Sequence, residues 1–252
     1  MSELSETQFL RYARHLILDE VGEEGQEKLL QSRVLVVGAG GLGSPLLLYL
    51  AAAGVGTLGI VDDDRVDLSN LQRQIIHPTD QVGALKAESA AATVATINPD
   101  VRVERHAVRL DERNVRDLVA RYDLVADGSD NFATRYLLND TCYVVRRTLI
   151  GAALSPFDGQ LSTFKPYLGP PHPCYRCLFR EAPPADLVPR CETAGILGAI
   201  AGVMGTLQAT EVLKELLGIG ESLSGQLLMY DALNTGFHKI RIPRDPDCPT
   251  CA

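Results

Sequence analysis

Four glycines that follow a run of valine and leucine could bring the backbone close to a phosphate. The turn from Gly38 to Gly43 fits the pattern G-x-G-x-x-G, between a predicted buried strand, Arg33–Val37, and a predicted helix. In this pattern the first glycine permits a tight turn, the second lets the backbone approach a phosphate, and the third lets helix and strand pack closely. The N–H groups at the start of the helix also favour an anion. We therefore predict a nucleotide site, with a turn that serves packing alone as the alternative. The glycines concerned are Gly38, Gly40, Gly41 and Gly43.

A group of acids follows the next predicted strand, Thr57–Val61. Asp62 is the first of three consecutive aspartates and lies 19 residues after Gly43. An acid at that distance can accept hydrogen bonds from ribose hydroxyls. At this point in the chain, an NAD enzyme is as good an interpretation as any other.

The following stretch adds amides and cations close to the predicted ribose acid. Lys86 lies on a helix expected over residues 82–97. Hydride transfer does not need an extra arginine and lysine near the phosphates, whereas a reacting triphosphate needs its charge neutralised. Arg73 and Lys86 taken singly could be surface charges, but together they favour a triphosphate. The stretch before Lys86 reads Ser69, Asn70, Leu71, Gln72, Arg73 and Gln74.

Two further acids come at the end of a short predicted strand, Leu124–Ala126. Asp127 and Asp130 should lie in the same crevice as Asp62, because ligands of open α/β sheets bind at the carboxyl ends of the strands. A carboxylate there can hold Mg²⁺ against phosphate oxygens. The alternative is that Asp130 caps a helix that begins near Asn131, and the two roles are compatible.

Four of the six cysteines form two C-x-x-C pairs. Paired thiols separated by a long stretch of chain are typical of a closed, structural Cys₄ zinc site. A redox C-x-x-C motif and an iron–sulfur cluster are the alternatives. The predicted ligands are Cys174, Cys177, Cys248 and Cys251.

A fifth cysteine, Cys191, follows a polar, proline-rich stretch, residues 180–189, that reads as a loop. Arg190 precedes Cys191, and a helix is expected from Thr193. A nearby arginine and a helix N-terminus favour the thiolate, which makes Cys191 a candidate nucleophile. The alternative is an incidental thiol. Cys142 lies within a helical pattern and is expected in the core.

Composition excludes several classes of protein. A net charge of −8 argues against a general nucleic-acid binder. The N-terminal stretch lacks the apolar core of a signal peptide, so a cytoplasmic location is expected. Two uncharged runs, 34–61 and 193–210, are rich in glycine, and we interpret both as parts of a water-soluble fold and not as membrane helices.

The expected fold is α/β, with a Rossmann-like, mostly parallel sheet, helices on both faces and antiparallel strands in its C-terminal part. Residues 1–252 are treated as a single domain. An N-terminal helical segment, 1–30, is followed by a nucleotide-binding part, 31–150, and a zinc-tied part, 151–252. Ser5 is expected to cap the first helix.

Taken jointly, these motifs resemble the bacterial E1-like adenylyltransferases that activate sulfur-carrier proteins. The resemblance covers nearly the whole chain. The segments that carry it are Arg11-Tyr12-Ala13-Arg14, GAGGLG, DLSNLQRQ, Lys86, GSDN, CYRC, RCETAG around Cys191, GVMGTLQATE and the terminal CPTC.

The resemblance implies roles for particular residues. The glycine turn would bind ATP, Asp62 the ribose, and Asp130 Mg²⁺. The family works as a homodimer, so Arg14 would reach into the partner subunit's site, and Cys191 matches a position used in persulfide or thioester chemistry by some members. Phosphate or nucleotide contacts would come from the segments that contain Ser69, Asn70, Leu71, Gln72, Arg73, Lys86 and Asn131, and zinc would be held by the four paired cysteines.

The implied reaction is attack of the C-terminal glycine carboxylate of a small ubiquitin-like protein on the α-phosphorus of ATP, which releases pyrophosphate. Because a carboxylate is already a nucleophile, the site needs positioning and charge stabilisation and no general base.

The partner would be a carrier ending in Gly-Gly, with a sulfurtransferase or a cysteine desulfurase as sulfur source. The molybdopterin and thiamine pathways stay open, although the ending LMYDALNTGF looks more like the molybdopterin type. Alternatives are an NAD-dependent oxidoreductase, a non-catalytic module, and an E1-like enzyme for a different substrate, such as a tRNA-modifying dehydratase.

Overall fold

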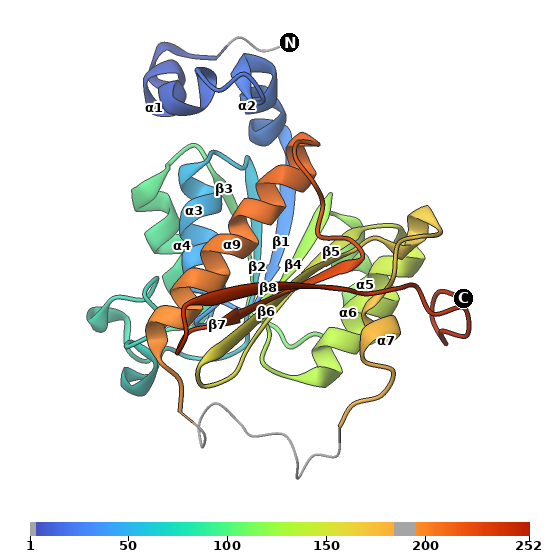
Figure 1. The fold of residues 1–252 in the computed structure, drawn as a ribbon. Coiled ribbons are helices and arrows are strands. Elements are labelled where there is room, and N and C mark those ends of the chain that lie inside the picture. Colours follow the sequence, from blue (N-terminus) through green and yellow to red (C-terminus); the bar gives the residue numbers. More distant parts are fainter. Residues whose placement is uncertain (1–3, 184–194) are drawn as a thin grey trace.

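The described residues form one eight-stranded sheet that runs through the molecule (Figure 1). The computed structural model describes residues 4–183 and 195–252. The strand order is β3-β2-β1-β4-β5-β6-β7-β8, with parallel pairing from β3 to β5 and antiparallel pairing from β5 to β8. The predicted mostly parallel sheet with antiparallel C-terminal strands is therefore confirmed.

The nucleotide-binding half alternates strands and helices, as its hydrophobic pattern predicts. Because β1 has β2 on one side and β4 on the other, the chain reverses its direction of winding there, and a crevice opens at the carboxyl ends of these strands. The elements are β1 (Arg33–Val37), α3 (Gly43–Ala52), β2 (Thr57–Val61), η1 (Leu68–Asn70), η2 (Thr79–Gln81), α4 (Lys86–Ile97), β3 (Arg102–His106), α5 (Val115–Ala120), β4 (Leu124–Asp127) and α6 (Phe132–Val145).

The remainder of the chain adds the antiparallel strands and the longest helix of the described residues. The short connection between β5 and β6 forces antiparallel pairing, because a parallel crossover needs a dozen residues or more. The elements are β5 (Thr148–Leu154), β6 (Asp158–Phe164), η3 (Pro166–Leu168), α7 (Tyr175–Leu178), α9 (Gly198–Leu217), β7 (Gln226–Asp231) and β8 (Gly236–Arg241).

Successive side chains along a strand point to opposite faces of the sheet, and on each face they pack against helices. Val34 and Val36 of β1 belong to a core shared with α3, α4 and α9, whereas Leu35 and Val37 belong to a core shared with α5 and α6. The first core is almost entirely aliphatic, whereas the second also contains aromatic side chains, and the removal of these apolar groups from water is the main stabilising contribution. Helices on both faces were predicted from the sequence.

Two N-terminal helices, α1 (Glu6–Leu16) and α2 (Gly22–Gln31), lie beyond the amino ends of the parallel strands (Figure 1). Ser5 and Gln8 form a capping box at the start of α1, which confirms the predicted cap. Tyr12 attaches α1 to the sheet part, because its hydroxyl accepts a 2.9 Å hydrogen bond from Asn98.

Three boundaries differ from the sequence-based expectation. The helix expected over 82–97 begins only at Lys86, because Gly83 has a φ of +91° that no helix adopts. Thr193, where a helix was expected to begin, lies outside the described residues; residues 195–197 are not helical, and α9 begins at Gly198. The sequence also predicts a helix over residues 111–121, and in the structure this helix, α5, begins only at Val115. Within the described part of the chain, no helix is long and apolar enough to cross a membrane.

Candidate nucleotide site and cysteine cluster

A cavity of about 670 Å³ opens at the carboxyl ends of β1, β2 and β4 and continues over β5 and β6. This volume is within the range of small-molecule sites. One end, which we call the nucleotide lobe, is lined by Gly38, Gly40, Gly41, Asp62, Arg73, Gln74, Lys86, Ser129, Asp130 and Asn131. The other end, which we call the second lobe, is lined by Gly151, Leu154, Pro156, Asp158, Gln160, Ser162, Phe164, Tyr175, Leu178 and Phe179.

The glycine turn has the conformation that its sequence predicts. Gly38 has a φ of +91°, which favours glycine, and a Cβ built on it would lie 3.0 Å from the carbonyl oxygen of Gly128. A Cβ on Gly43 would collide with the carbonyl oxygen of Gly38, so the third glycine permits close packing of α3. The backbone is thus held close to the loop after β4, with its N–H groups near the cavity.

Asp62 closes the turn from the end of β2. Its Oδ2 accepts a 2.8 Å hydrogen bond from the N–H of Ala39, and its Oδ1 accepts one of 2.9 Å from the N–H of Asp64. Burial raises the pKa of Asp62 above the usual range, although the charge of Lys86 and these two N–H groups oppose the rise. The carboxylate is therefore fixed in position beside the turn.

Two cations reach the nucleotide lobe from separate elements. Lys86 is the first residue of α4, and its Nζ lies 2.8 Å from Asp64 Oδ2. The Lys86 side chain is 7% exposed, whereas that of Asp64 is 69% exposed, so the ammonium is buried and its partner faces solvent. Arg73 lines the same lobe from the turn after η1. Fixed positive charges at the end of a cavity suit a polyphosphate.

The loop after β4 brings an exposed carboxylate to the same place. Asp127 is buried, and its Oδ1 accepts a 2.8 Å hydrogen bond from the N–H of Ser129. Asn131 caps α6, because its Oδ1 accepts a 2.9 Å hydrogen bond from the N–H of Thr134. The capping role considered for Asp130 therefore belongs to its neighbour. Asp130 lines the cavity as an exposed carboxylate, a hard oxygen ligand of the kind that Mg²⁺ prefers.

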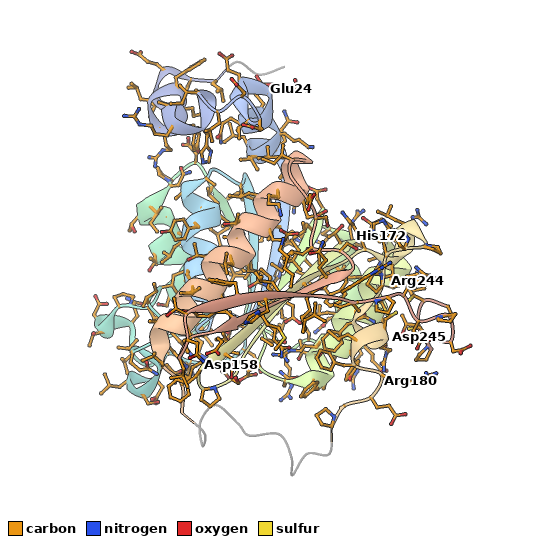
Figure 2. All side chains as sticks on the ribbon, viewed as in Figure 1. Glu24, Asp158, His172, Arg180, Arg244 and Asp245 are labelled. Carbon is orange, nitrogen blue, oxygen red and sulfur yellow. The ribbon has the colours of Figure 1, made fainter. Side chains whose placement is uncertain are left out.

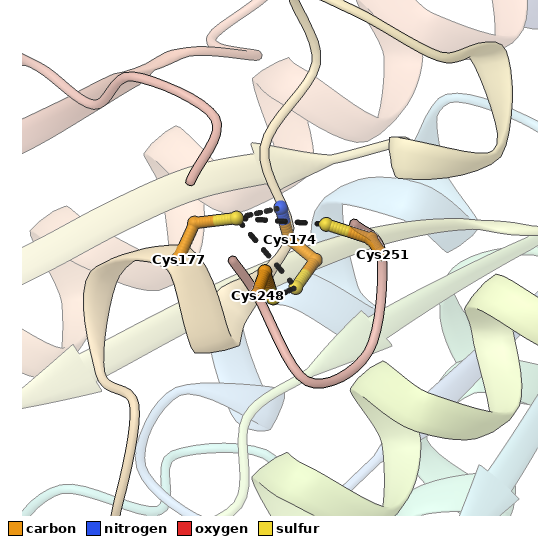
Figure 3. A group of neighbouring side chains, drawn as sticks. All are labelled: Cys174, Cys177, Cys248 and Cys251. Carbon is orange, nitrogen blue, oxygen red and sulfur yellow. Dashed lines mark hydrogen bonds between the residues drawn. The ribbon is translucent and has the colours of Figure 1, made fainter. Parts of the chain in front are cut away.

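The four paired cysteines converge in space, as predicted (Figure 3). Their sulfur atoms all lie within 4.8 Å of one another, and all four cysteines are free of disulfides. The Cys174–Cys248 and Cys177–Cys251 sulfurs are both 3.5 Å apart. A tetrahedral zinc ion with Zn–S bonds of about 2.3 Å separates its sulfurs by roughly 3.8 Å. The N–H of Asp245 also points to Cys177 Sγ at 3.4 Å, so the donor set fits zinc.

The cysteine cluster is attached to the helix that begins at the nucleotide lobe. Asp140 of α6 accepts hydrogen bonds from Arg176 and from the Thr250 hydroxyl, which lie between the cysteines of the two pairs. Asn139, also on α6, accepts a 2.7 Å hydrogen bond from the N–H of Tyr175. Tyr175 lines the second lobe, so the cluster fixes one wall of the cavity.

A further ion pair joins the two cysteine pairs outside the cluster. Arg180 lies beside Asp245, with 3.4 Å between guanidinium nitrogen and carboxylate oxygen, and it donates a hydrogen bond to the carbonyl of Asp247 (Figure 2). Both groups are accessible to solvent, so this contact contributes little by itself.

The sequence matches the family described as "ThiF family" over residues 12–250. The chain belongs to the ThiF family.

Named relatives agree with this assignment. The SAMP-activating enzyme E1 of Haloferax volcanii is 55% identical to this ThiF-family chain, over 98% of the chain and 90% of the relative. The sulfur carrier protein adenylyltransferase of Thermus thermophilus is 51% identical, over 96% of the chain and 90% of the relative. These relatives confirm the expected family and the expected class of enzyme, an adenylyltransferase.

A solved structure confirms the fold. The crystal structure of E. coli MccB with AMPCPP and MccA superposes with a TM-score of 0.83, over 96% of this chain and 74% of that one. The sequences are 21% identical, so this likeness concerns the fold alone.

Several predicted residues of this ThiF-family chain lie away from the cavity lining. Gly43 serves packing, and Arg14 is exposed on α1, beyond the opposite end of the strands (Figure 1). Ser69, Asn70, Leu71 and Gln72 form η1 and the turn that carries Arg73, and are not among the described lining residues. Cys191 lies outside the described residues.

Three polar residues that line the cavity were not among the predicted site residues. Gln74 Oε1, Ser129 Oγ and Arg135 Nε are buried and have no hydrogen-bond partner among the described residues. Gln74 belongs to the amide-rich stretch, and Arg135 follows Asn131 by one helical turn, so it faces the same side of α6. Helical spacing could have indicated Arg135.

Proposed function

We propose that the chain adenylates the C-terminal glycine carboxylate of a small ubiquitin-like sulfur-carrier protein. A carboxylate oxygen forms a bond to the α-phosphorus of ATP, the bond between the α-phosphorus and the bridging oxygen breaks, and pyrophosphate leaves. The observation that carries the proposal is the two-lobed cavity, in which the glycine turn, Arg73 and Lys86 lie at one end and space for a second ligand continues over β5 and β6. The named activities of the relatives support the same chemistry.

Each group of the nucleotide lobe has a distinct part in this proposal. Asp62 accepts hydrogen bonds from the ribose, and the glycine turn offers N–H groups to the phosphates. Arg73 and Lys86 stabilise the charge that moves to the leaving pyrophosphate, with Asn70 as a further phosphate contact. Asp130 would hold Mg²⁺, which supplies positive charge at the phosphate oxygens when bound.

The second lobe is the proposed place of the carrier's tail. A tail that ends in Gly-Gly has no side chains near its carboxylate, so it can enter between Gly151 on β5 and the aromatic wall formed by Tyr175 and Phe179. Arg135 also lines the cavity, where it donates a 2.9 Å hydrogen bond to the carbonyl of Ser129, and its guanidinium suits a carboxylate that approaches the α-phosphorus. Holding both reactants in one cavity converts a bimolecular reaction into a unimolecular one.

A homodimer is part of the proposal. Helix α1, which carries Arg14, lies beyond the amino ends of the strands, whereas the cavity lies at their carboxyl ends, so only a partner subunit could place Arg14 at a site (Figure 1). Apolar side chains of α1 and its C-terminal end are left uncovered in one chain, since Phe9, Leu10 and Ile17 are 39%, 76% and 71% exposed. Such uncovered apolar side chains are typical of an interface. We further propose that residues 1–252 act as one adenylation domain.

The pathway is proposed from the sequence pattern of the C-terminal part. The segment from Leu228 to Phe237 contains most of β7, the turn after it and the first two residues of β8. It resembles the molybdopterin type, so molybdopterin biosynthesis is favoured over thiamine biosynthesis. The sulfur would be supplied afterwards by a sulfurtransferase or a cysteine desulfurase.

The test is ATP–pyrophosphate exchange with purified carriers of the two pathways. A carrier-dependent exchange, with carrier adenylate detected by its mass, is expected for one of them. Asp130→Ala should lower the exchange rate at least 100-fold or so, as the loss of a group that stabilises charge in the transition state. The control is Asp80→Ala, at an exposed aspartate of η2. Exchange that is absent with both carriers would refute the proposed function, and full exchange by Asp130→Ala would refute the role of Asp130.

A further inference from the structure

Helix α9 inserts one amide side chain between the two strands that border the cavity. Gln208 is fully buried. Its Nε2 donates hydrogen bonds of 2.8 Å to the carbonyl oxygen of Asp127 and 2.9 Å to that of Ile150. The two carbonyls belong to neighbouring strands, since Asp127 of β4 pairs with Gly151 of β5. One side chain therefore joins β4 and β5 where both reach the cavity.

Only a side chain with two donors on one nitrogen can make this contact. Both acceptors are carbonyl oxygens, so the orientation of the Gln208 amide is fixed by chemistry, and both hydrogens of its NH₂ group are used. The Oε1 atom has no partner within the described residues. An unpaired buried amide oxygen is a cost, which indicates that the two donated hydrogen bonds are what this position provides.

The segment that Gln208 holds leads directly to residues of both lobes. Gly128 follows Asp127, donates its N–H to the carbonyl of Val37 at 2.9 Å, and presents its own carbonyl to Gly38. Ser129 and Asp130 come next and line the nucleotide lobe. Gly151 follows Ile150 and lines the second lobe.

Helix α9 is itself held against the glycine turn. A Cβ on Gly205 would collide with Leu42 and Pro45 at the start of α3, and a Cβ on Gly41 would lie 3.2 Å from Ala201. Gln208 comes one turn after Gly205, so its amide is anchored to the same rigid contact.

We propose that Gln208 is a positioning residue for the adenylation reaction. By holding the carbonyls of Asp127 and Ile150, it sets the distance between the loop that carries Asp130 and the strand that borders the carrier's tail. Gln208 does not line the cavity itself, so it acts on catalysis through these two segments. This proposal rests on the proposed function.

The matched pair of variants is Gln208→Met and Glu211→Met. Methionine has the length of glutamine and no N–H donor. Glu211 is also buried on α9, and its Oε1 accepts hydrogen bonds from the Thr163 hydroxyl at 2.9 Å and the Leu223 N–H at 2.7 Å. Neither of these partners is a lining residue of the cavity. Gln208→Met loses two buried hydrogen bonds to the strands that border the cavity. Glu211→Met loses two buried hydrogen bonds to residues outside the lining and, in addition, the ion pair of Glu211 Oε2 with Lys214 Nζ at 2.6 Å.

The first measurement is pyrophosphate exchange with separate kcat and KM for ATP. Gln208→Met should lower kcat roughly 10- to 100-fold, with KM for ATP changed by less than about 3-fold, because misplacement of about 1 Å acts on the transition state more than on binding. Glu211→Met should change kcat by less than about 3-fold at a comparable loss of Tm. Equal kcat values for the two variants would overturn the proposal.

A second measurement needs no turnover. Amide hydrogen exchange at residues 128–131 should be roughly 10-fold faster in Gln208→Met than in wild type and unchanged in Glu211→Met. Where Gln208→Met does not fold, Gln208→Asn replaces it, because the shorter amide reaches one carbonyl only and a smaller change of the same sign is expected. Absence of pyrophosphate exchange in the wild type would refute the proposed function and would not bear on the role of Gln208 in holding residues 128–131. Amides that exchange equally fast in the Gln208 and Glu211 variants would refute the role of Gln208.

Discussion

The ring of His77 connects the glycine turn to α4. Its Nε2 lies 2.8 Å from the carbonyl oxygen of Ala39, and its Nδ1 lies 2.9 Å from the Ser89 hydroxyl. Burial lowers the pKa of His77 below its usual value, and the charge of Lys86 lowers it further, against the hydrogen bond to Ala39. The neutral ring therefore donates to Ala39 through Nε2 and accepts from Ser89 at Nδ1.

His77→Phe should destabilise the protein by about 1–3 kcal/mol near neutral pH, because the buried carbonyl of Ala39 loses its donor. Since the native pKa lies below the unfolded value, the unfolded chain binds the proton first as the pH falls below about 6.5. The wild type should thus lose stability from pH 7.5 to 5.5 more steeply than His77→Phe does. Urea unfolding at both pH values measures this, with the exposed His238→Phe as control. If the free energy of unfolding changes with pH equally in wild type and His77→Phe, the predicted contribution of His77 is contradicted.

A network around Glu104 of β3 gives a second dependence on pH. Burial alone would raise the pKa of Glu104, but hydrogen bonds from Arg33 and Tyr122, with the charges of Arg33 and Arg121, lower it to about 2. The Glu104 side chain is 10% exposed, whereas that of Arg121 is 51% exposed, so screening by water weakens the interaction.

Glu104→Gln should lower the free energy of unfolding at pH 7 by on the order of 2 kcal/mol, because the neutral amide lacks the negative charge that the neighbouring arginines attract. The native pKa is lowered, so this stabilisation is complete above about pH 4.5 and is lost as the pH falls toward 2. Urea unfolding at pH 7, 4 and 3 should show the difference between wild type and variant shrinking with pH. A difference that is the same at pH 7 and pH 3 would show that the carboxylate charge is not responsible.

We propose that the cysteine cluster binds zinc, and loss of this ion should loosen the aromatic wall of the second lobe. Cys248→Ser is expected to lose zinc, lower Tm and reduce the near-ultraviolet circular dichroism of the tyrosines, because Tyr175 lies between two ligands. The chain has no tryptophan and 8 tyrosines, so indole bands do not obscure this signal. Cys142→Ser is the control, at a buried cysteine outside the cluster. An unchanged tyrosine signal after loss of zinc would show that the cluster does not fix the position of the cavity wall.

Complementation between inactive variants tests whether Arg14 acts across a dimer. Arg14→Ala and Asp130→Ala should each be inactive alone. In a mixed dimer one site has Asp130 from one subunit and Arg14 from the other, so random mixing should restore roughly a quarter of wild-type exchange activity. An Arg14 that acts within its own chain gives no recovery on mixing. Mixing either variant with itself is the control.

Local patterns in the sequence were sufficient for the elements that carry the glycine turn, Asp62 and Asp130. Each of these features lies within one strand–turn–helix unit, where residue spacing determines geometry. The cysteine pairs were also recognisable, because ligand spacing by itself indicates a metal.

The residues that sequence analysis missed depend on contacts between distant segments. Gln208 meets Asp127 across 81 positions of the chain, and His77 meets Ala39 across 38. No periodicity encodes such pairs, since they result from how α9 and α4 pack on the sheet. The exposed apolar residues of α1 pose the same difficulty, because the sequence does not say whether its own chain or another covers them.

The connection between the two cysteine pairs has a consequence for the order of events during synthesis. The first pair leaves the ribosome roughly 70 residues before the second, an interval of several seconds at about 5–20 residues per second. In that interval β1 to β4 can already pair, whereas the cavity wall that contains Tyr175 still lacks two of the four cysteines of the cluster that fixes it. A nascent chain therefore forms its glycine turn first and completes the second lobe last, when Cys248 and Cys251 have emerged.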